Sequence, residues 1–215
     1  MRFWGRYLSP ALLLALAFAA TGCSGFFVYP GSTGGGGSTS TGNYVYVANA
    51  GTGSIAGFSI GSSTLTAVNG SPYNLGFAPT AVAINPANSI LFLGNTNSIY
   101  AFAINADGSL SVLNNGSAVG LAAVASMDIS PDGQWLFALD QNGFTIEQFQ
   151  INSSTGLLTA QLPTTYPSSG AVIPRAIRVA PNGSYVFVAL GTGGDLVFPF
   201  NTSTGWRDRR RFRPY

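Results

Sequence analysis

The amino-acid sequence predicts an all-β fold, a β-propeller of four-stranded blades of which about three and a half are present. The first observation is composition: 7% of the residues are charged, lysine and histidine are absent, and Gly, Ser, Thr and Asn fill the polar positions. Such a composition is typical of short β-branched and aromatic strands joined by tight turns. The second observation is an internal repeat of about 45 residues, which begins at residue 43.

The N-terminal residues 1–22 have the pattern of a bacterial export signal. Arg2 and Arg6 precede a short apolar segment, residues 11–20, and Cys23, the one cysteine, follows in the sequence ATGCS. This resembles the lipobox of bacterial lipoproteins, in which the cysteine becomes the first mature residue and carries the lipid. The alternatives are a transmembrane anchor and an ordinary secretory signal, but ten apolar residues are too few to span roughly 30 Å of hydrocarbon.

The lipobox resemblance implies that the membrane is a partner, through lipid on Cys23. Several acyl chains on one residue anchor durably. Ser24, and not Asp, follows the cysteine, which in Gram-negative lipoproteins implies transfer to the outer membrane, on its periplasmic or surface face. Residues 23–42 then form the acylated start of the domain and a linker. Its Gly/Ser/Thr-rich part, 30–42, is expected to be a flexible coil with a reach of about 20 Å.

The repeat covers residues 43–205 and rests on four similar strands. These begin at Tyr44, Ile90, Trp135 and Tyr185, at spacings of 46, 45 and 50 residues. The second strands of the units are residues 55–60, 99–104, 146–151 and 196–201, the third strands lie in 62–68, 107–113 and 153–160, and small apolar strands that end in proline turns lie in 80–86, 126–133 and 176–183. Four short strands at this period predict a propeller blade, and their two-residue alternation argues against a helical solenoid.

The strand YVYVAN, the turns SPDG and APNG and the STG-x-L-T turns resemble the YVTN-type repeats of the lactonase family, whose members are 6-phosphogluconolactonase-like. The resemblance covers residues 43–205. It implies seven blades in a complete ring and, for an enzyme of this type, the hydrolysis of a sugar lactone. The motifs serve turns and packing in every blade, so they indicate the fold much more than the activity.

The last ten residues, 206–215, depart from the repeat. The segment 201–205 (NTSTG) should continue as residues 157–159 do, yet the sequence becomes WRDRRRFRPY. One interpretation is a basic tail that binds membrane or nucleic acid, and the other, which we favour, is a frameshift or truncated gene model. Because an open half ring leaves strand edges unpaired, an aggregation hazard, we expect this chain to be poorly soluble or to self-associate.

Charge argues against a nucleic-acid partner. Between Cys23 and Gly205 the chain has two arginines and six acidic residues, a net charge of 2 − 6 = −4, so this region offers no basic surface for a phosphate backbone. No cofactor or metal is expected either. Histidine is absent, the one cysteine is assigned to lipid, and the carboxylates are not clustered at the spacing of a calcium loop.

The candidate site lies on the proline-turn strands, which should line the propeller axis. Aligning them makes Asp128 and Arg178 equivalent to Ala83, and Arg175 equivalent to Thr80. One hypothesis is that Asp128, Arg175 and Arg178 form a cluster that binds a carboxylate or phosphate. The other, which we favour, is that Asp128 and Arg178 on adjacent blades pair with each other.

Catalysis would have to use the few titratable groups present. The segment PRAIRVAPNG keeps the Pro, Arg, Pro and Gly of the family's PRH-x-x-F-x-P-x-G, but Ala176 replaces its histidine. Opening a lactone requires a base, so Asp128 or Glu147 would serve, with Arg175 orienting an anionic substrate. We therefore expect a scaffold that binds a small anionic or sugar-derived ligand or a protein partner. The alternatives are a lactone hydrolase of the 6-phosphogluconolactonase type and a truncated product without function.

Overall fold

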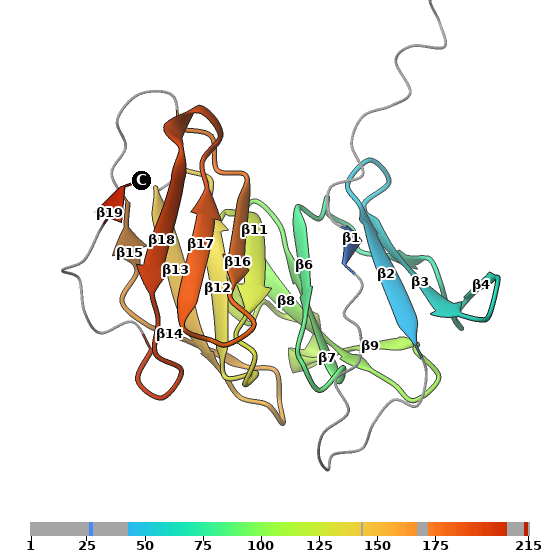
Figure 1. Cartoon of the computed structure of the whole chain (residues 1–215). Helices are drawn as coiled ribbons and strands as arrows, with labels where there is room; N and C mark the ends of the chain where they lie inside the picture. The colour runs from blue at the N-terminus through green and yellow to red at the C-terminus, as the bar shows by residue number, and fades with distance from the viewer. Residues whose placement is uncertain (1–25, 28–42, 143, 167–171, 206–212, 215) are drawn as a thin grey trace, which may run out of the picture.

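The structure is a computed structural model. It describes residues 26–27, 43–142, 144–166, 172–205 and 213–214. The chain is all-β, as the sequence predicts, and forms four antiparallel sheets that stand side by side (Figure 1). The export signal, Cys23, the Gly/Ser/Thr-rich segment and residues 206–212 of the tail lie outside the described residues. Within the described part, no helix has the length and apolarity needed to cross a membrane.

Each sheet corresponds to one unit of the repeat. The first sheet contains β1 (Phe26–Phe27), β2 (Tyr44–Asn49), β3 (Ser54–Ile60), β4 (Leu65–Ala67) and β5 (Tyr73–Asn74). The second contains β6 (Ala81–Ile84), β7 (Ile90–Gly94), β8 (Ser98–Ile104), β9 (Leu110–Val112) and β10 (Gly120–Leu121). The third contains β11 (Val124–Ile129), β12 (Trp135–Asp140), β13 (Thr145–Ile151), β14 (Leu158–Ala160) and β15 (Thr164–Thr165). The fourth contains β16 (Ala176–Val179), β17 (Tyr185–Ala189), β18 (Asp195–Pro199) and β19 (Arg213–Pro214), and two short 3-10 turns are η2 (Asn114–Gly116) and η3 (Gly191–Gly193).

The outermost position is split in the first three sheets. In the third sheet, β14 and β15 both pair with β13, one along each half of that strand. The same holds for β4 and β5 on β3, and for β9 and β10 on β8. The sequence predicts the first piece of each pair. It does not reveal the second piece, because a strand of two residues shows no alternation.

Two short strands fall in the segments that the sequence assigns to the linker and the tail. β1 occupies the innermost position of the first sheet, where Phe26 pairs with Val47 of β2. β19 pairs with β18 at the outer side of the fourth sheet, where Arg213 lies opposite Val197. Both sheets therefore have four strand positions within the described residues.

Apolar clusters between neighbouring sheets hold the structure together. Leu91 packs toward the first sheet and the adjacent Phe92 toward the third, because successive side chains of a strand point to opposite faces. Leu136 and Phe137 repeat this arrangement one sheet further along. All four side chains are fully buried. Burial of a side chain of this size stabilises the fold by about 1.5–3 kcal/mol, which explains why the central strands are apolar throughout.

The four sheets form part of a propeller ring. The inner strand β11 contacts β6 of the second sheet and β16 of the fourth, and the split outer strands lie at the rim (Figure 1). The first and fourth sheets stand at opposite ends of the described structure, so the sheets do not close on themselves. This agrees with the predicted partial propeller, and Asp128 and Arg178 lie on the inner strands β11 and β16.

Candidate functional site

The register of the inner strands confirms the predicted alignment of Asp128 and Arg178. Asp128 of β11 pairs with Phe137, and Arg178 of β16 pairs with Phe187. Ala83 has the matching position in the second sheet, opposite Phe92. Neighbouring sheets therefore present these three positions at the same level along the inner side of the structure.

Both carboxylate oxygens of Asp128 accept hydrogen bonds from backbone N–H groups. Its Oδ2 accepts the N–H of Val179, on the fourth sheet, at 2.8 Å, and its Oδ1 accepts the N–H of Ile129 at 2.9 Å. Burial raises the pKa of the Asp128 carboxyl, and the two N–H donors and the positive charge of Arg178 oppose this rise. Asp128 thus links the third sheet to the inner strand of the fourth.

Two further side chains make the same kind of link, and sequence reasoning did not identify them. The Ser126 hydroxyl accepts the N–H of Ile177 at 3.3 Å, and the Thr80 hydroxyl donates to the carbonyl of Val124 at 2.5 Å. These bonds join the third sheet to the fourth and the second to the third. The available signal was a short polar side chain on an otherwise apolar inner strand.

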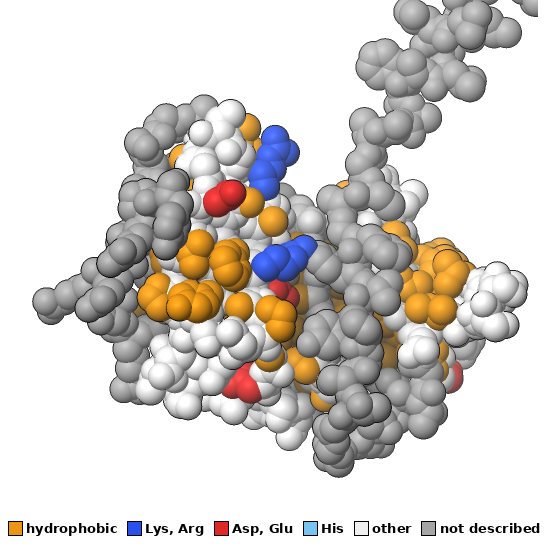
Figure 2. All heavy atoms as spheres, in the orientation of Figure 1, with side chains coloured by type: hydrophobic (Ala, Val, Ile, Leu, Met, Phe, Trp, Pro, Cys, Tyr) orange, Lys and Arg blue, Asp and Glu red, His pale blue; other side chains and the backbone are white. Residues whose placement is uncertain are grey.

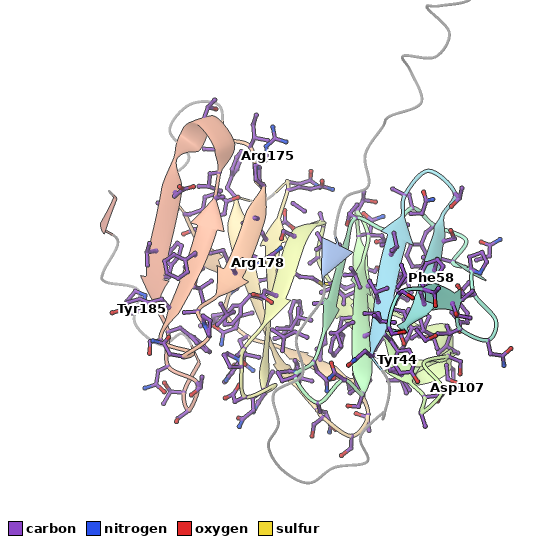
Figure 3. The ribbon with its side chains drawn as sticks, turned by 45° about the vertical axis from the view of Figure 1, so that its right-hand side comes forward. Tyr44, Phe58, Asp107, Arg175, Arg178 and Tyr185 are labelled. Atoms are coloured by element: carbon purple, nitrogen blue, oxygen red, sulfur yellow. The ribbon has the colours of Figure 1, made fainter. Side chains whose placement is uncertain are left out.

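The two arginines lie at different levels of the fourth sheet (Figure 3). Arg178 is half-buried within β16, and its Nη1 donates to the carbonyl of Ile177 at 2.6 Å. Arg175 is exposed just before β16, and its backbone N–H donates to the carbonyl of Ala189 at 2.9 Å. The Arg178 charge acts on Asp128, whereas Arg175 is available to solvent at the end of the strand.

Glu147 lies apart from the other candidate residues. It pairs with Ala138, whereas Asp128 and Gln148 both pair with Phe137. Directly paired residues share a face, so Glu147 lies on the opposite face of the third sheet from Asp128. Its carboxylate accepts the hydroxyl of Thr145 at 2.9 Å. Cys23, the candidate lipidation site, lies outside the described residues.

An open hollow of about 230 Å³ lies on the fourth sheet, beside Arg178. Asp195 is its second charged residue. The remaining lining residues are Ala176, Phe187, Val188, Ala189 and Leu196. One guanidinium among apolar walls can bind a small carboxylate or phosphate, although the Asp195 carboxylate limits the attraction for a highly charged anion.

A tyrosine cluster at the other end of the structure was also missed from the sequence. Tyr44 and Tyr46 of the first sheet donate to the carbonyls of Ala106 and Gly108, at 2.8 and 2.6 Å. Burial is the main cause of the raised pKa of Tyr46. Figure 3 shows Tyr44 near Asp107, at the turn that these hydroxyls bind. The cluster fastens the first sheet to a turn of the second.

Among the described residues, no group of three or more His, Cys, Asp or Glu side chains is placed to hold a metal ion. The titratable residues near the inner strands offer two kinds of binding. They can bind an anion through a guanidinium and bind backbone N–H groups through a carboxylate.

Comparison with known proteins gives one family match. Residues 95–169 match the family described as lactonase, 7-bladed β-propeller. This segment contains β8, β9 and β10 of the second sheet and the whole third sheet. No curated protein matches the chain.

Solved structures share the fold. A candidate 6-phosphogluconolactonase from Bacteroides uniformis is 17% identical, with a TM-score of 0.66 over 81% of this chain and 55% of its own. A second, from Bacteroides fragilis, is 23% identical, with a TM-score of 0.59 over 76% of this chain and 49% of its own. The periplasmic gluconolactonase PpgL from Pseudomonas aeruginosa is 19% identical, with a TM-score of 0.62 over 78% and 50%. The chain thus spans about half the length of the structures that it matches.

Proposed function

Because the chain is a β-propeller of the lactonase family, through the match of residues 95–169, we propose that it is an exported, lipid-anchored scaffold that binds a ligand or partner. The proposal has two parts, a cellular location and a molecular activity. The proposed cellular location rests on the export signal and on Cys23. The fold shared with a periplasmic gluconolactonase is compatible with a cell-envelope location.

The observation that carries the scaffold role is the engagement of Asp128. A general base must be directed at water or substrate, whereas both Asp128 oxygens are directed at backbone N–H groups. Glu147 lies on the other face of the sheet. The other charged groups near the candidate site are the two arginines and the exposed Asp195, and the arginines bind anions without being suited to deprotonate water.

Lactone hydrolysis is the second candidate, and the family match favours it. In this mechanism Arg175, which is exposed, orients an anionic sugar lactone by paired hydrogen bonds. Asp128, whose pKa is raised by burial, activates a water molecule that adds to the lactone carbonyl, and the ring C–O bond then breaks to give the hydroxy acid. No cofactor is required. Residues outside this chain could contribute in a complete ring.

The proposed cellular location is tested by expressing the full chain in a Gram-negative host that is fed radiolabelled palmitate. We expect label and membrane association for the natural sequence, and neither for Cys23→Ser, because the acyl acceptor is removed. Ser24→Asp is the matched control, since it keeps the cysteine and should retain the labelled protein in the inner membrane. Persistent label in the Cys23→Ser variant would contradict the lipoprotein assignment.

The activity is tested by measuring the rate at which the purified full chain hydrolyses 6-phosphogluconolactone. The scaffold role predicts hydrolysis at the spontaneous rate, whereas the hydrolase role predicts a faster rate that collapses in Arg175→Ala. Arg175→Lys separates charge from geometry, because lysine keeps the charge but loses the paired hydrogen bonds. Enzymatic turnover that depends on Arg175 would replace the scaffold proposal with the hydrolase.

A further inference from the structure

The short strand β1 brings the candidate lipid-bearing residue close to the propeller. Cys23 lies three residues before Phe26, which pairs with Val47 of β2. An extended chain spans at most about 3.3–3.6 Å per residue, so the Cα atom of Cys23 lies within about 11 Å of the Cα atom of Phe26. The Gly/Ser/Thr-rich segment 30–42 follows β1 in the chain, so it does not separate Cys23 from the first sheet.

The direction of β1 selects one end of the propeller. Because β1 and β2 are antiparallel, the chain enters β1 from the side on which β2 ends, at Asn49. We call this side the upper end and define it by the connections between the second and third strands of the sheets, residues 50–53, 95–97, 141–144 and 190–194. The lower end is the opposite one, where the second strands begin. Figure 3 shows Arg175 at the upper end and Tyr44 and Asp107 at the lower end.

Two exposed apolar side chains lie at the upper end of the second and third sheets. Leu121 of β10 pairs with Ser98, the first residue of β8, and is 76% exposed. Phe144 directly precedes β13 and is 39% exposed, with a positive φ of 50° that is uncommon for a bulky residue. Its carbonyl accepts the N–H of Tyr166 at 3.2 Å, and its ring packs edge-on against the Tyr166 ring. Because both sheets already have a neighbour on each face, further blades of a longer chain would leave Leu121 and Phe144 exposed.

The exposed charges of the described residues also distinguish the two ends. At the upper end Arg175 and Asp195 are exposed, and their charges cancel. At the lower end Asp107 and Asp132 are exposed, and both are negative. Figure 2 shows basic side chains in the upper and middle parts of the visible face and acidic ones also in its lower part. An anionic bilayer surface attracts basic groups and repels carboxylates, so it favours the upper end.

We propose that the upper end of the propeller lies against the membrane, with Leu121 and Phe144 at the lipid–water interface. The partner is the phospholipid bilayer that holds the acyl chains of Cys23, because the span from Cys23 to β1 is too short to carry the upper end away from that bilayer. Apolar area placed in the interface adds to the anchoring by the acyl chains. The lower end then faces the aqueous compartment. This inference rests on the lipid anchor of the proposed function.

The test measures how close two probes on one strand lie to the bilayer. Acylation blocks the one natural cysteine, so a single introduced cysteine is labelled specifically. Asn142→Cys places a fluorophore just after β12, at the upper end, and Gln134→Cys places it just before β12, at the lower end; both natural side chains are exposed. Eight residues separate the two positions, about 25 Å along an extended strand.

Each labelled, acylated full chain is reconstituted into vesicles of phosphatidylethanolamine and phosphatidylglycerol that contain phosphatidylcholine with a nitroxide quencher on its headgroup. The probe at residue 142 should lose most of its emission, and the probe at residue 134 should keep it. Radiolabelled palmitate on Cys23 is measured in the same preparation. Equal quenching of the two probes in an acylated chain, or stronger quenching at residue 134, would overturn the orientation and leave the lipid anchor standing. A chain without acyl label would overturn both.

A double variant, Leu121→Asp with Phe144→Asp, tests the apolar contact. It should reduce the quenching of the probe at residue 142, because carboxylates are repelled by the anionic surface. Leu157→Asp is the matched control, since Leu157 is 43% exposed just before β14, at the lower end, and its substitution should leave the quenching unchanged. The melting temperature of the double variant shows whether it is folded. Unchanged quenching in the folded double variant, or an equal reduction in Leu157→Asp, would overturn the contact of Leu121 and Phe144 with the bilayer.

Discussion

At the scale of single residues, Asp128 shows how side chains join the inner strands of neighbouring sheets. An inner strand such as β16 pairs with one strand only, the second strand of its own sheet. Its carboxylate accepts the N–H of Val179 from the neighbouring sheet. Ala83, at the equivalent position of the second sheet, has no group that could do this, and there the Thr80 hydroxyl makes the link to the third sheet. Between neighbouring blades, hydrogen bonds made by single polar side chains thus take the place of the backbone hydrogen-bond ladder that joins strands within a blade.

Replacing Asp128 by alanine should lower the free energy of unfolding by about 2 kcal/mol, since two partly buried N–H groups lose their acceptor. Urea unfolding followed by circular dichroism measures this change. Asp195→Ala removes an exposed carboxylate and should stay within about 0.5 kcal/mol of the natural chain. Equal losses for the two variants would show that Asp128 does not stabilise the junction.

The raised pKa of Asp128 also predicts a pH dependence. The folded chain keeps this proton at pH values where the unfolded chain, with a pKa of about 3.9, has released it. This contribution to stability is fully present below the unfolded pKa and is lost as pH rises through the folded pKa. Asp128→Asn does not titrate. The difference in unfolding free energy, natural chain minus Asp128→Asn, should therefore fall as pH rises from about 4 and then become constant; a constant or rising difference would contradict it.

The sequence predicted which charged residues share an inner-strand position, but not what they bind. The alignment of Asp128 with Arg178 follows from the proline-turn repeat and is confirmed by the strand register. The partners of Asp128 are backbone N–H groups, which every residue except proline has, so no sequence pattern could indicate them. The position of Glu147 on the opposite face depends on the register between β12 and β13, which the repeat alone does not fix.

At the scale of elements, the second strand of the second sheet approaches the inner strand of the third sheet closely at Gly94. A Cβ atom at this position, at the end of β7, would lie 2.8 Å from the Cβ of Val124 on β11. Real Cβ atoms do not approach so closely, so either the strand or its neighbour would have to move. Glycine here permits the contact between the second and third sheets.

Gly94→Ala should therefore destabilise the chain by about 1–3 kcal/mol through overpacking. Thermal unfolding should show a lower melting temperature. Gly51→Ala is the matched control, since its Cβ would meet nothing closer than 3.5 Å and the substitution should be close to neutral. If both variants melt together with the natural chain, the backbones at Gly94 are free to separate.

Strand prediction succeeded where the repeat was strong and failed where pairing depended on distant contacts. The four strands that begin at Tyr44, Ile90, Trp135 and Tyr185 have the predicted starts. In the fourth sheet the next strand is Asp195–Pro199 and not 196–201, although the N–H of Phe200 still donates to the carbonyl of Ser184. The short outer strands β5, β10 and β15, and the register shift between Val124 and Ser126 in β11, depend on tertiary pairing.

At the scale of the whole molecule, the apolar clusters join each sheet only to its immediate neighbours. Stability in such an array is a sum of terms for single units and for adjacent pairs. The second and third sheets have two covered faces, whereas the end sheets expose one. Local opening should begin at the ends.

Amide hydrogen exchange of the natural chain tests this expectation. We expect β17 to exchange faster than β12 and β7, because the fourth sheet is packed against a neighbouring sheet on one face, whereas Tyr185 and Phe187 are exposed on the other. Uniform exchange across all four sheets would indicate a single cooperative unit instead.

The split outer strand has a practical consequence for labelling this protein. Between β9 and β10, the chain passes through exposed Asn115, with a positive φ of 52°, before it returns to pair with β8. The corresponding connection between β14 and β15 is much shorter, so the rim accommodates extra chain without disturbing the inner strands. An affinity tag or fluorescent probe inserted at this loop would project outward from the rim, away from the inner strands and from Asp128.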